Sequence, residues 1–222
     1  MADPGPDTVP APTAVEARLP PGSGSQPVEL ELPDGAARYW PAALEPGEAT
    51  RAFEALRRRI DWQAEAILIF GRRVPVPRLV AWHGDPEARY SYSGTAHEPR
   101  PWTAELAQLR DLAARLTGAR YNAVLLNLYR DGRDGMGWHA DDEPELGTDP
   151  VIASVSLGAT RRFCLRHRRR TSLRLDLPLA HGSLLCMSGA TQHHWVHALP
   201  KTATAVGERI NLTFRWIGPR DP

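Results

Sequence analysis

Short strand-like segments that follow one another through the second half of the chain limit its possible folds more than any other feature. Glycine, proline or charged turn residues separate each segment from the next. Many short strands punctuated in this way are typical of sandwiches and jelly rolls. The segments expected to form strands are 122–130, 136–141, 151–158, 161–167, 172–177, 183–188, 193–198 and 208–217. Together they predict a double-sheet jelly roll.

Two amphipathic helices are expected ahead of these strands. The first begins at Pro46 and carries Phe53, Leu56 and Ile60 on one face. The second covers residues 102–116 and is followed by a glycine that suits a helix C-terminus. The chain is therefore predicted to be α+β, mainly β, with N-terminal helices beside a jelly-roll core.

Composition divides the 222 residues into a tail and one domain. Residues 1–35 are rich in proline, glycine, alanine and serine without apolar periodicity, so we expect a disordered tail. Residues 36–222 suffice for a single domain with its own core. Within it, 120–217 would form the jelly roll. Residues 66–100 alternate apolar and polar positions between prolines and glycines, which predicts hairpins outside the main core, as in a flap.

Composition also narrows the class of protein. No apolar stretch approaches the roughly 20 residues that span a bilayer, and the first residues lack the pattern of a secretory signal. Cys164 and Cys186 lie in apolar runs and are expected to be reduced core thiols. We therefore expect a cytoplasmic monomer with no membrane partner. Every basic residue except Lys201 is arginine, which suits bidentate phosphate contacts but equally fits codon bias.

A candidate metal site begins with His139 and Asp141, which form an H-x-D pair. In a strand, residues i and i+2 share one face, so both side chains can reach one ion. Two histidines and one carboxylate leave coordination positions open for a co-substrate and O₂. The remaining ligand would be His193, His194 or His197, and a strand over 193–198 would put His193 and His197 on one face. Alone, this pair is weak evidence, because a structural histidine is more common than a metal ligand.

The last predicted strand carries an unusual polar face. Alternation puts Arg209, Asn211 and Arg215 on one side and apolar residues on the other. Inside a sandwich the two guanidinium groups would need anionic partners, which a small dicarboxylate can provide. Asn127 and Tyr129, another i, i+2 pair, precede the H-x-D pair and can complete such a pocket. The alternative is an edge strand whose polar face is solvated.

Four motifs identify a family. NLYRDGRDGMGWHADDE, LPLAHGSLL, HHWVHALP and RINLTFRW, in this order, closely resemble the AlkB family of Fe(II)- and 2-oxoglutarate-dependent alkylation-repair dioxygenases. The resemblance runs from about Ile67 to Ile217 and is nearest to the homologues that act on duplex DNA. It implies a double-stranded β-helix that carries a nucleotide-recognition lid, here residues 66–100.

The resemblance also implies which residues bind the metal and the co-substrate. The residues that would bind Fe(II) are His139, Asp141 and His197. Those that would hold the distal carboxylate of 2-oxoglutarate are Arg209, Tyr129 and Asn211. Arg215 and Asn127 would hold the carboxylate that chelates iron.

A pocket for a flipped base is implied as well. Tyr92 would stack on the base, with Tyr90 and Ser93 lining the same pocket and Glu143 reading the base edge. Phe70, within Ile69-Phe70-Gly71, would fill the gap that the base leaves in the duplex. The plain alternative for Phe70 and Tyr92 is an ordinary place in the core of the hairpins.

A basic cluster lies in and around one expected hairpin. Its members are Arg161, Arg162, Arg166, His167, Arg168, Arg169, Arg170 and Arg174. They are expected to contact phosphates, and the alternative is a solvated basic turn. The loop is shorter than in the duplex-acting homologues, which puts a grip on the complementary strand in doubt.

The expected function is oxidative demethylation of N-alkylated bases in DNA, such as 1-methyladenine and 3-methylcytosine. The reaction would consume 2-oxoglutarate and O₂ and release succinate, CO₂ and an aldehyde. Three alternatives stay open from the sequence: the same chemistry on RNA or protein, a non-catalytic binding module for damaged DNA, and a cupin-like protein with another metal. The last would leave Arg209 and Arg215 without a purpose.

Overall fold

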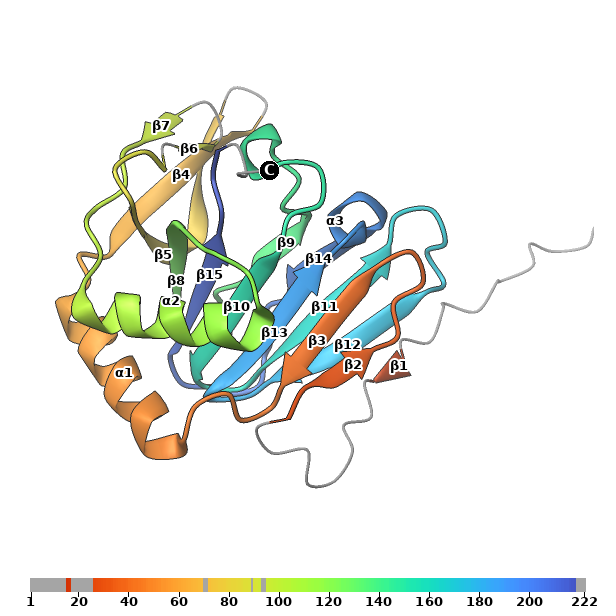
Figure 1. Ribbon diagram of the computed structural model, residues 1–222, viewed down its shortest axis with the longest axis horizontal. Coiled ribbons are helices and arrows are strands. Elements are labelled where there is room, and N and C mark those ends of the chain that lie inside the picture. Colours follow the sequence, from red (N-terminus) through yellow and green to blue (C-terminus); the bar gives the residue numbers. More distant parts are fainter. Residues whose placement is uncertain (1–14, 17–25, 70–71, 89, 93–94, 219–222) are drawn as a thin grey trace, which may run out of the picture.

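The computed structural model describes residues 15–16, 26–69, 72–88, 90–92 and 95–218 (Figure 1). Side chains are described for 26–66, 74–88 and 98–218. Most of this chain forms two antiparallel sheets that face each other, with two helices packed on the outside of the larger sheet. The prediction of a mainly β, α+β jelly roll is therefore confirmed.

The larger sheet holds the strands that carry most of the candidate site. In spatial order they are β2 (Val28–Leu30), β3 (Ala36–Trp40), β13 (Ser183–Ser188), β10 (Ile152–Gly158), β15 (Arg209–Arg215), β8 (Ala123–Tyr129), β5 (Arg72–Gly84) and β4 (Gln63–Ile69). Strand β15 lies near the middle, between β10 and β8, where Asn211 is opposite both Ser156 and Asn127.

The smaller sheet supplies the remaining site residues. Its order is β1 (Val15–Glu16), β12 (Arg174–Leu179), β11 (Arg161–His167), β14 (Trp195–Leu199) and β9 (Met136–His139). Short helical turns, η1 (Pro144–Leu146) and α3 (Thr191–His194), flank this sheet, and β6 (Tyr90–Tyr92) pairs separately with β7 (Thr95–His97). Strand β9 is an edge strand, bonded only to β14 among the described strands.

Two apolar layers follow from the period-2 alternation of the strands. On β15, Ile210, Leu212 and Phe214 are fully buried in the layer beneath α1 (Pro46–Arg59) and α2 (Ala104–Thr117). The opposite face of β15 looks into the space between the sheets, where Leu165 and Leu177 form the second layer. The polar face of β15 is therefore inside the sandwich, which excludes the solvated-edge alternative.

Helix α1 begins at Pro46 as predicted but ends before Ile60, and α2 begins two residues later than predicted. Thr103 caps α2, because its side-chain oxygen accepts a hydrogen bond from the backbone N–H of Leu106 at 3.2 Å. Gly118 ends the helix in a left-handed conformation, with φ of 74°. Within the described residues, no helix is both long and apolar enough to cross a membrane.

The predicted tail is wrong for residues 26–35. Strand β2 pairs with β3, and Leu30 and Leu32 are buried in the layer between the sheets. The carbonyl of Pro33 accepts a hydrogen bond from the indole of Trp195 at 2.9 Å. The alternation of Val28, Leu30 and Leu32 was the signal of a half-buried strand, and proline and glycine around it concealed that signal.

Residues 66–100 were expected outside the main core, and this is wrong for their middle. Leu79 to Gly84 of β5 pair with β8, and Val80, Ala81 and Trp82 are buried. Of the described strands in this region, β6 and β7 alone pair with each other as a separate two-stranded sheet. A lid function for this region stays a prediction.

Candidate active site

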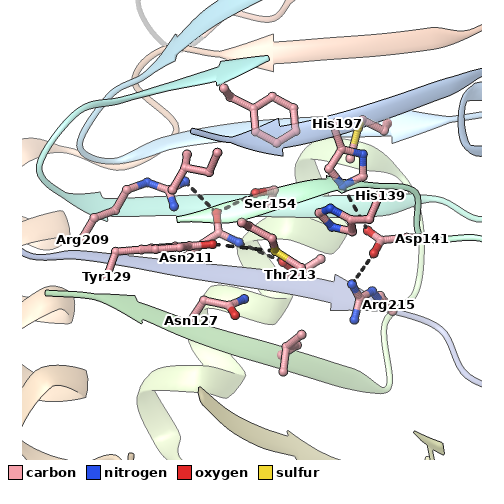
Figure 2. A pocket seen from close by; sticks show the side chains of 15 residues that line it. Asn127, Tyr129, His139, Asp141, Ser154, His197, Arg209, Asn211, Thr213 and Arg215 are labelled. Atoms are coloured by element: carbon pink, nitrogen blue, oxygen red, sulfur yellow. Dashed lines mark hydrogen bonds and ion pairs between the residues drawn. The ribbon is translucent and has the colours of Figure 1, made fainter. Parts of the chain in front are cut away.

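His139, Asp141 and His197 converge at one point of the sandwich (Figure 2). Each offers one ligand atom, and these atoms lie within 4.8 Å of one another. The two histidines are direct neighbours because His139 of β9 is opposite His197 of β14 in the ladder. Of the three histidines that the sequence left open as the last ligand, the structure brings His197 into this group.

Two details of this local structure differ from the expectation. Strand β9 ends at His139, so Asp141 lies just beyond the strand rather than within it. Residues 191–194 form a helical turn, and His193 therefore does not share a strand face with His197. The buried amide of Gln192 holds Asp141 instead: its side-chain oxygen accepts a hydrogen bond from the Asp141 backbone N–H at 3.0 Å. Nothing in the sequence pattern singles out Gln192.

The hydrogen bond of the His139 ring prepares it for a metal. Its Nδ1 lies 2.9 Å from the carbonyl oxygen of Gly137. A carbonyl can only accept, so Nδ1 carries the proton and Nε2 keeps its lone pair. Ligating histidines usually donate their other ring N–H in this way, which fixes the tautomer and the orientation of the ring.

The charges of the group suit a divalent cation. Burial alone would raise the pKa of Asp141, but Arg215, His197 and His139 together bring it below its ordinary value. Burial, aided by His139, lowers the pKa of His197 to about 3. At neutral pH the site thus holds a carboxylate and a neutral imidazole, the forms that bind metal.

Beside the metal group, Arg209 lies fully buried, and none of the described residues provides it with a carboxylate partner. Its guanidinium donates hydrogen bonds to Ser156 Oγ and Asn211 Oδ1, both at 2.8 Å, and lies 5.4 Å from the ring centre of Tyr129. Burial lowers its pKa to about 10, and no carboxylate is among the groups that influence it. Its Nε has no hydrogen-bond partner among the described residues. A buried cation in this state fits an anionic ligand.

Arg215 lies at the other end of the same pocket, and Asn127, which is opposite Asn211 in the ladder, lies between the two arginines (Figure 2). Arg215 donates to Asp141 Oδ1 at 2.6 Å, which leaves Asp141 Oδ2 facing His197. Asn127 Oδ1 accepts a hydrogen bond from Arg78 Nε at 2.8 Å. Arg78 is a buried cation that the sequence did not reveal, because it lies among alternating residues of β5 with no motif around it.

The comparisons with known proteins agree with this geometry. The model of the 2OG-Fe(II) oxygenase superfamily matches residues 36–215. The DNA oxidative demethylase ALKBH2 of Bos taurus is 42% identical over 182 residues, which cover 78% of this chain and 66% of that protein. The alpha-ketoglutarate-dependent dioxygenase alkB homolog 3 of Rattus norvegicus is 40% identical over 206 residues, which cover 87% and 69% of the two chains. The chain belongs to the AlkB family of 2OG-Fe(II) oxygenases.

A solved structure supports the fold independently. OsALKBH1 superimposes with a TM-score of 0.63 over 85% of this chain and 100% of that chain, at 14% identity. Membership of the AlkB family makes the protein an Fe(II)- and 2-oxoglutarate-dependent dioxygenase. The donor set of His139, Asp141 and His197 fits Fe(II), and buried Arg209 fits the far carboxylate of 2-oxoglutarate.

A second pocket of this AlkB-family chain opens on the other side of the metal group. It shares His139, Asp141 and Arg215 with the first, and Trp82 and Glu143 line it further out. Glu143 is thus where a residue that reads a base edge would lie. The other residues expected at the base, Phe70, Tyr90, Tyr92 and Ser93, lie outside the described residues or have side chains outside them.

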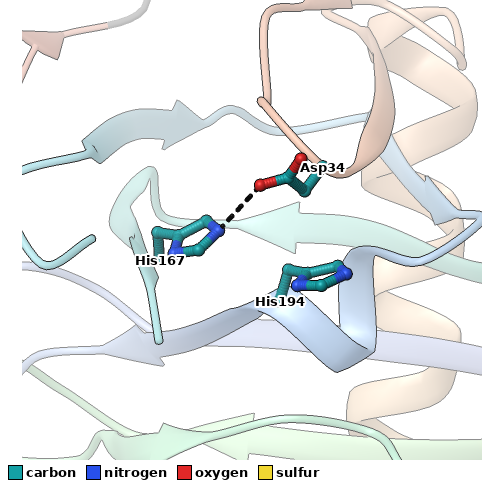
Figure 3. A group of neighbouring side chains, drawn as sticks. All are labelled: Asp34, His167 and His194. Atoms are coloured by element: carbon teal, nitrogen blue, oxygen red, sulfur yellow. Dashed lines mark hydrogen bonds and ion pairs between the residues drawn. The ribbon is translucent and has the colours of Figure 1, made fainter. Parts of the chain in front are cut away.

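Asp34, His167 and His194 form a second group with metal-ligand spacing (Figure 3). The hydrogen bonds of the His167 ring are the reverse of those of the His139 ring. His167 Nδ1 accepts hydrogen bonds from the backbone N–H groups of Arg169 and Arg170, at 3.2 and 2.9 Å. Its proton must therefore be on Nε2, which faces Asp34 Oδ2 at 3.3 Å. A metal could bind Nε2 only if that proton were removed. We therefore interpret the group as a structural contact that joins the N-terminal segment to β11, and not as a metal site.

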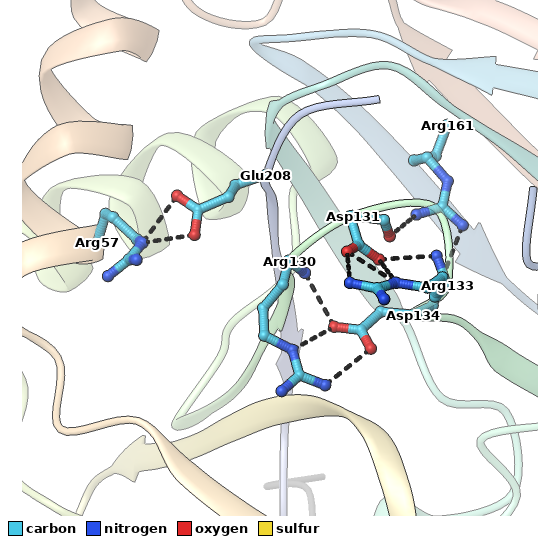
Figure 4. A network of polar contacts seen from close by, with 7 residues as sticks. All are labelled: Arg57, Arg130, Asp131, Arg133, Asp134, Arg161 and Glu208. Atoms are coloured by element: carbon cyan, nitrogen blue, oxygen red, sulfur yellow. Dashed lines mark hydrogen bonds and ion pairs between the residues drawn. The ribbon is translucent and has the colours of Figure 1, made fainter. Parts of the chain in front are cut away.

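The basic cluster is largely engaged within the protein, and Arg161 is not a phosphate contact. Arg161 is buried and donates to the backbone carbonyls of Asp131, Asp134 and Pro200, at 3.1, 2.9 and 2.8 Å (Figure 4). It therefore fixes the loop between β8 and β9.

Several other members of the cluster face acids. Arg162 pairs with Asp176, Arg168 with Asp142, and Arg170 with Asp34. These ion pairs explain much of the high arginine content of β11 and its turn without nucleic acid. Phosphate contacts by the remaining arginines stay a prediction.

Proposed function

We propose that this protein removes N-alkyl groups from DNA bases by oxidation; its relative ALKBH2 is named a DNA oxidative demethylase. The observation that carries the proposal is that two neighbouring pockets share residues of the metal group. The pocket around Arg209 (the dicarboxylate pocket) and the pocket lined by Trp82 and Glu143 (the outer pocket) both include His139, Asp141 and Arg215. A co-substrate and a base can therefore reach one metal from two sides.

Fe(II), 2-oxoglutarate and O₂ together supply the oxidation: one oxygen atom enters a C–H bond of the N-alkyl group, and the other enters succinate as CO₂ leaves. The hydroxylated alkyl group then separates from the ring nitrogen as an aldehyde. The chain's own residues bind and orient the reactants. Arg209 and Arg215 would hold the two ends of 2-oxoglutarate, and His139, Asp141 and His197 the metal.

The outer pocket favours a cationic base. Glu143 and Glu65 line it beside the indole of Trp82, and its two arginines, Arg78 and Arg215, already donate to Asn127 and Asp141. Alkylation at N1 of adenine or N3 of cytosine gives the base a positive charge, which carboxylates and an aromatic face both attract. We therefore propose 1-methyladenine and 3-methylcytosine as lesions. Action as a monomer and a cytoplasmic location remain predictions from the sequence.

The test is formaldehyde release from an oligonucleotide with one 1-methyladenine, in single- and double-stranded form, with Fe(II), ascorbate and 2-oxoglutarate. Release by the wild type and none by Asp141→Ala is the expected result. A folded Asp141→Ala protein that still turns over would refute the metal assignment. Consumption of 2-oxoglutarate without formaldehyde from either DNA form would refute DNA as substrate and direct the search to methylated RNA.

A further inference from the structure

An exposed tryptophan stands immediately outside the metal site. Among the residues whose burial is described, the exposed large hydrophobic side chains are Trp138 at 44% and Val74 at 40%. Trp138 precedes His139 on β9, and successive side chains of a strand point to opposite faces. The indole of Trp138 therefore lies on the opposite face of β9 from the His139 ring and is exposed to solvent.

Arg166 covers one face of this indole. Its guanidinium carbon lies 4.5 Å from the ring centre, within the range of a cation–π contact. The two residues come from strands on either side of β14, with β9 at the sheet edge and β11 further in. Arg166 therefore orients the indole and adds positive charge.

Trp138 and Val74 border one groove that leads to the active site. Residues 74–78 of β5 form one wall, and Leu199 to Lys201 form part of the other. The groove shares Met136, His139 and Arg78 with the outer pocket of the active site. The described residues that line it include an arginine and a lysine and no carboxylate.

From these contacts we infer that the groove binds the unpaired nucleotide next to the flipped base, whose base stacks on the free face of Trp138. The sequence-tolerant partner of an aromatic face beside cations is a single nucleic-acid strand. Lys201, which is exposed, would then face a neighbouring phosphate. This inference rests on the proposed function, because it places a strand of the same substrate beyond the active site.

Binding of unmodified DNA tests the groove independently of catalysis. Fluorescence anisotropy with a labelled, unmodified single-stranded oligonucleotide gives the Kd of the wild type, Trp138→Ala and Trp138→Phe. We expect Trp138→Ala to raise Kd about tenfold, since one base–aromatic stack is lost, and Trp138→Phe to stay within about threefold of wild type. On a fully paired duplex, where the bases are not free to stack, Trp138→Ala should change Kd less than about twofold.

Two variants that each remove one positive charge distinguish the contact between Arg166 and the indole from a general effect of net charge on binding. Arg166→Ala and Arg162→Ala each remove one cation from β11, but only Arg166 contacts the indole. Arg166→Ala should weaken single-strand binding more than Arg162→Ala at the same salt concentration. Consumption of 2-oxoglutarate without nucleic acid, measured in every variant, shows that the neighbouring metal site is intact.

Equal single-strand affinity of wild type and Trp138→Ala would overturn the inference, and so would equal losses on single and double strands. Failure of the proposed function looks different: the affinity pattern of the variants would persist while no formaldehyde is released from the methylated oligonucleotide.

Discussion

Two buried arginines of this protein are expected to respond in opposite ways to the same substitution. Arg209 and Arg161 are 1% and 3% exposed. Arg161 donates to three backbone carbonyls, so its charge is satisfied in the free protein. Arg209 has two neutral partners, Ser156 and Asn211, and no carboxylate among the groups that shift its pKa. We compare Arg209→Met with Arg161→Met.

The magnitudes follow from these contacts. Burial lowers the pKa of Arg209 from its ordinary value to about 10, which at ~1.4 kcal/mol per unit disfavours its charged form by about 3 kcal/mol. Methionine removes this penalty together with two hydrogen bonds worth about 1 kcal/mol each, and it leaves Ser156 Oγ without that partner. The free energy of unfolding of Arg209→Met should therefore stay within about 1 kcal/mol of wild type. Arg161→Met should lose about 3–5 kcal/mol, because three backbone carbonyls, one of them fully buried, lose their donor.

Affinity for 2-oxoglutarate should change in the reverse order. Loss of a buried charged partner costs about 2–5 kcal/mol of binding, so Arg209→Met should raise the KM for 2-oxoglutarate at least about 30-fold. The assays are urea unfolding with and without 2-oxoglutarate and Mn(II), and succinate formation with Fe(II). Saturating co-substrate should stabilise wild type by about 3 kcal/mol at a hundred times its Kd and leave Arg209→Met unchanged. A strongly destabilised Arg209→Met with normal KM would refute the reasoning.

Three further predictions concern the surroundings of the site. Gln192→Ala removes the acceptor that fixes the Asp141 backbone, and it should weaken activation by Fe(II) about 10- to 100-fold with little change in the KM for 2-oxoglutarate; an unchanged Fe(II) dependence would contradict this role. Metal titration should find one Co(II) per chain, and His194→Ala should keep that stoichiometry, since the tautomer of His167 disfavours a second site; loss of one of two bound ions would contradict it. Burial lowers the pKa of His83 below 6.5, so the stability that neutral His83 contributes is present above pH 6.5 and is lost as pH falls toward its folded pKa. In urea unfolding between pH 7.5 and 5.5, the free energy of unfolding should therefore decline less in His83→Gln than in wild type. Parallel curves for the two proteins would argue against this role.

The sequence predicted those parts of the structure that depend on periodicity. Alternation over 209–215 indicated both the core face of β15 and its polar face, and the structure places the polar face inside the sandwich. The two helices followed from apolar spacing and from a glycine at the C-terminus of α2. The convergence of His139, Asp141 and His197 was expected from residue type and spacing, although the backbone around Asp141 is not a strand.

What the sequence could not predict depends on contacts between distant segments. Gln192 and Arg78 act through single hydrogen bonds to Asp141 and Asn127, and neither lies in a pattern that marks it as buried. Arg161 was grouped with surface arginines because it is adjacent to them in sequence, whereas the ladder turns its side chain inward. Residues 26–35 were assigned to the tail by composition, although pairing with β3 and packing of Leu30 and Leu32 between the sheets decide their state.

Strand β15 has a consequence for how the molecule transmits binding. Its seven residues are buried on both faces, and the helices on one side and the co-substrate pocket on the other contact the same stretch of backbone. A one-residue shift of register would turn Arg209 toward the helices and Ile210 toward the pocket, and so disrupt both layers at once. Because the pocket and the layer beneath the helices share the backbone of β15, occupancy of the pocket and the resistance of that layer to local unfolding should be thermodynamically linked.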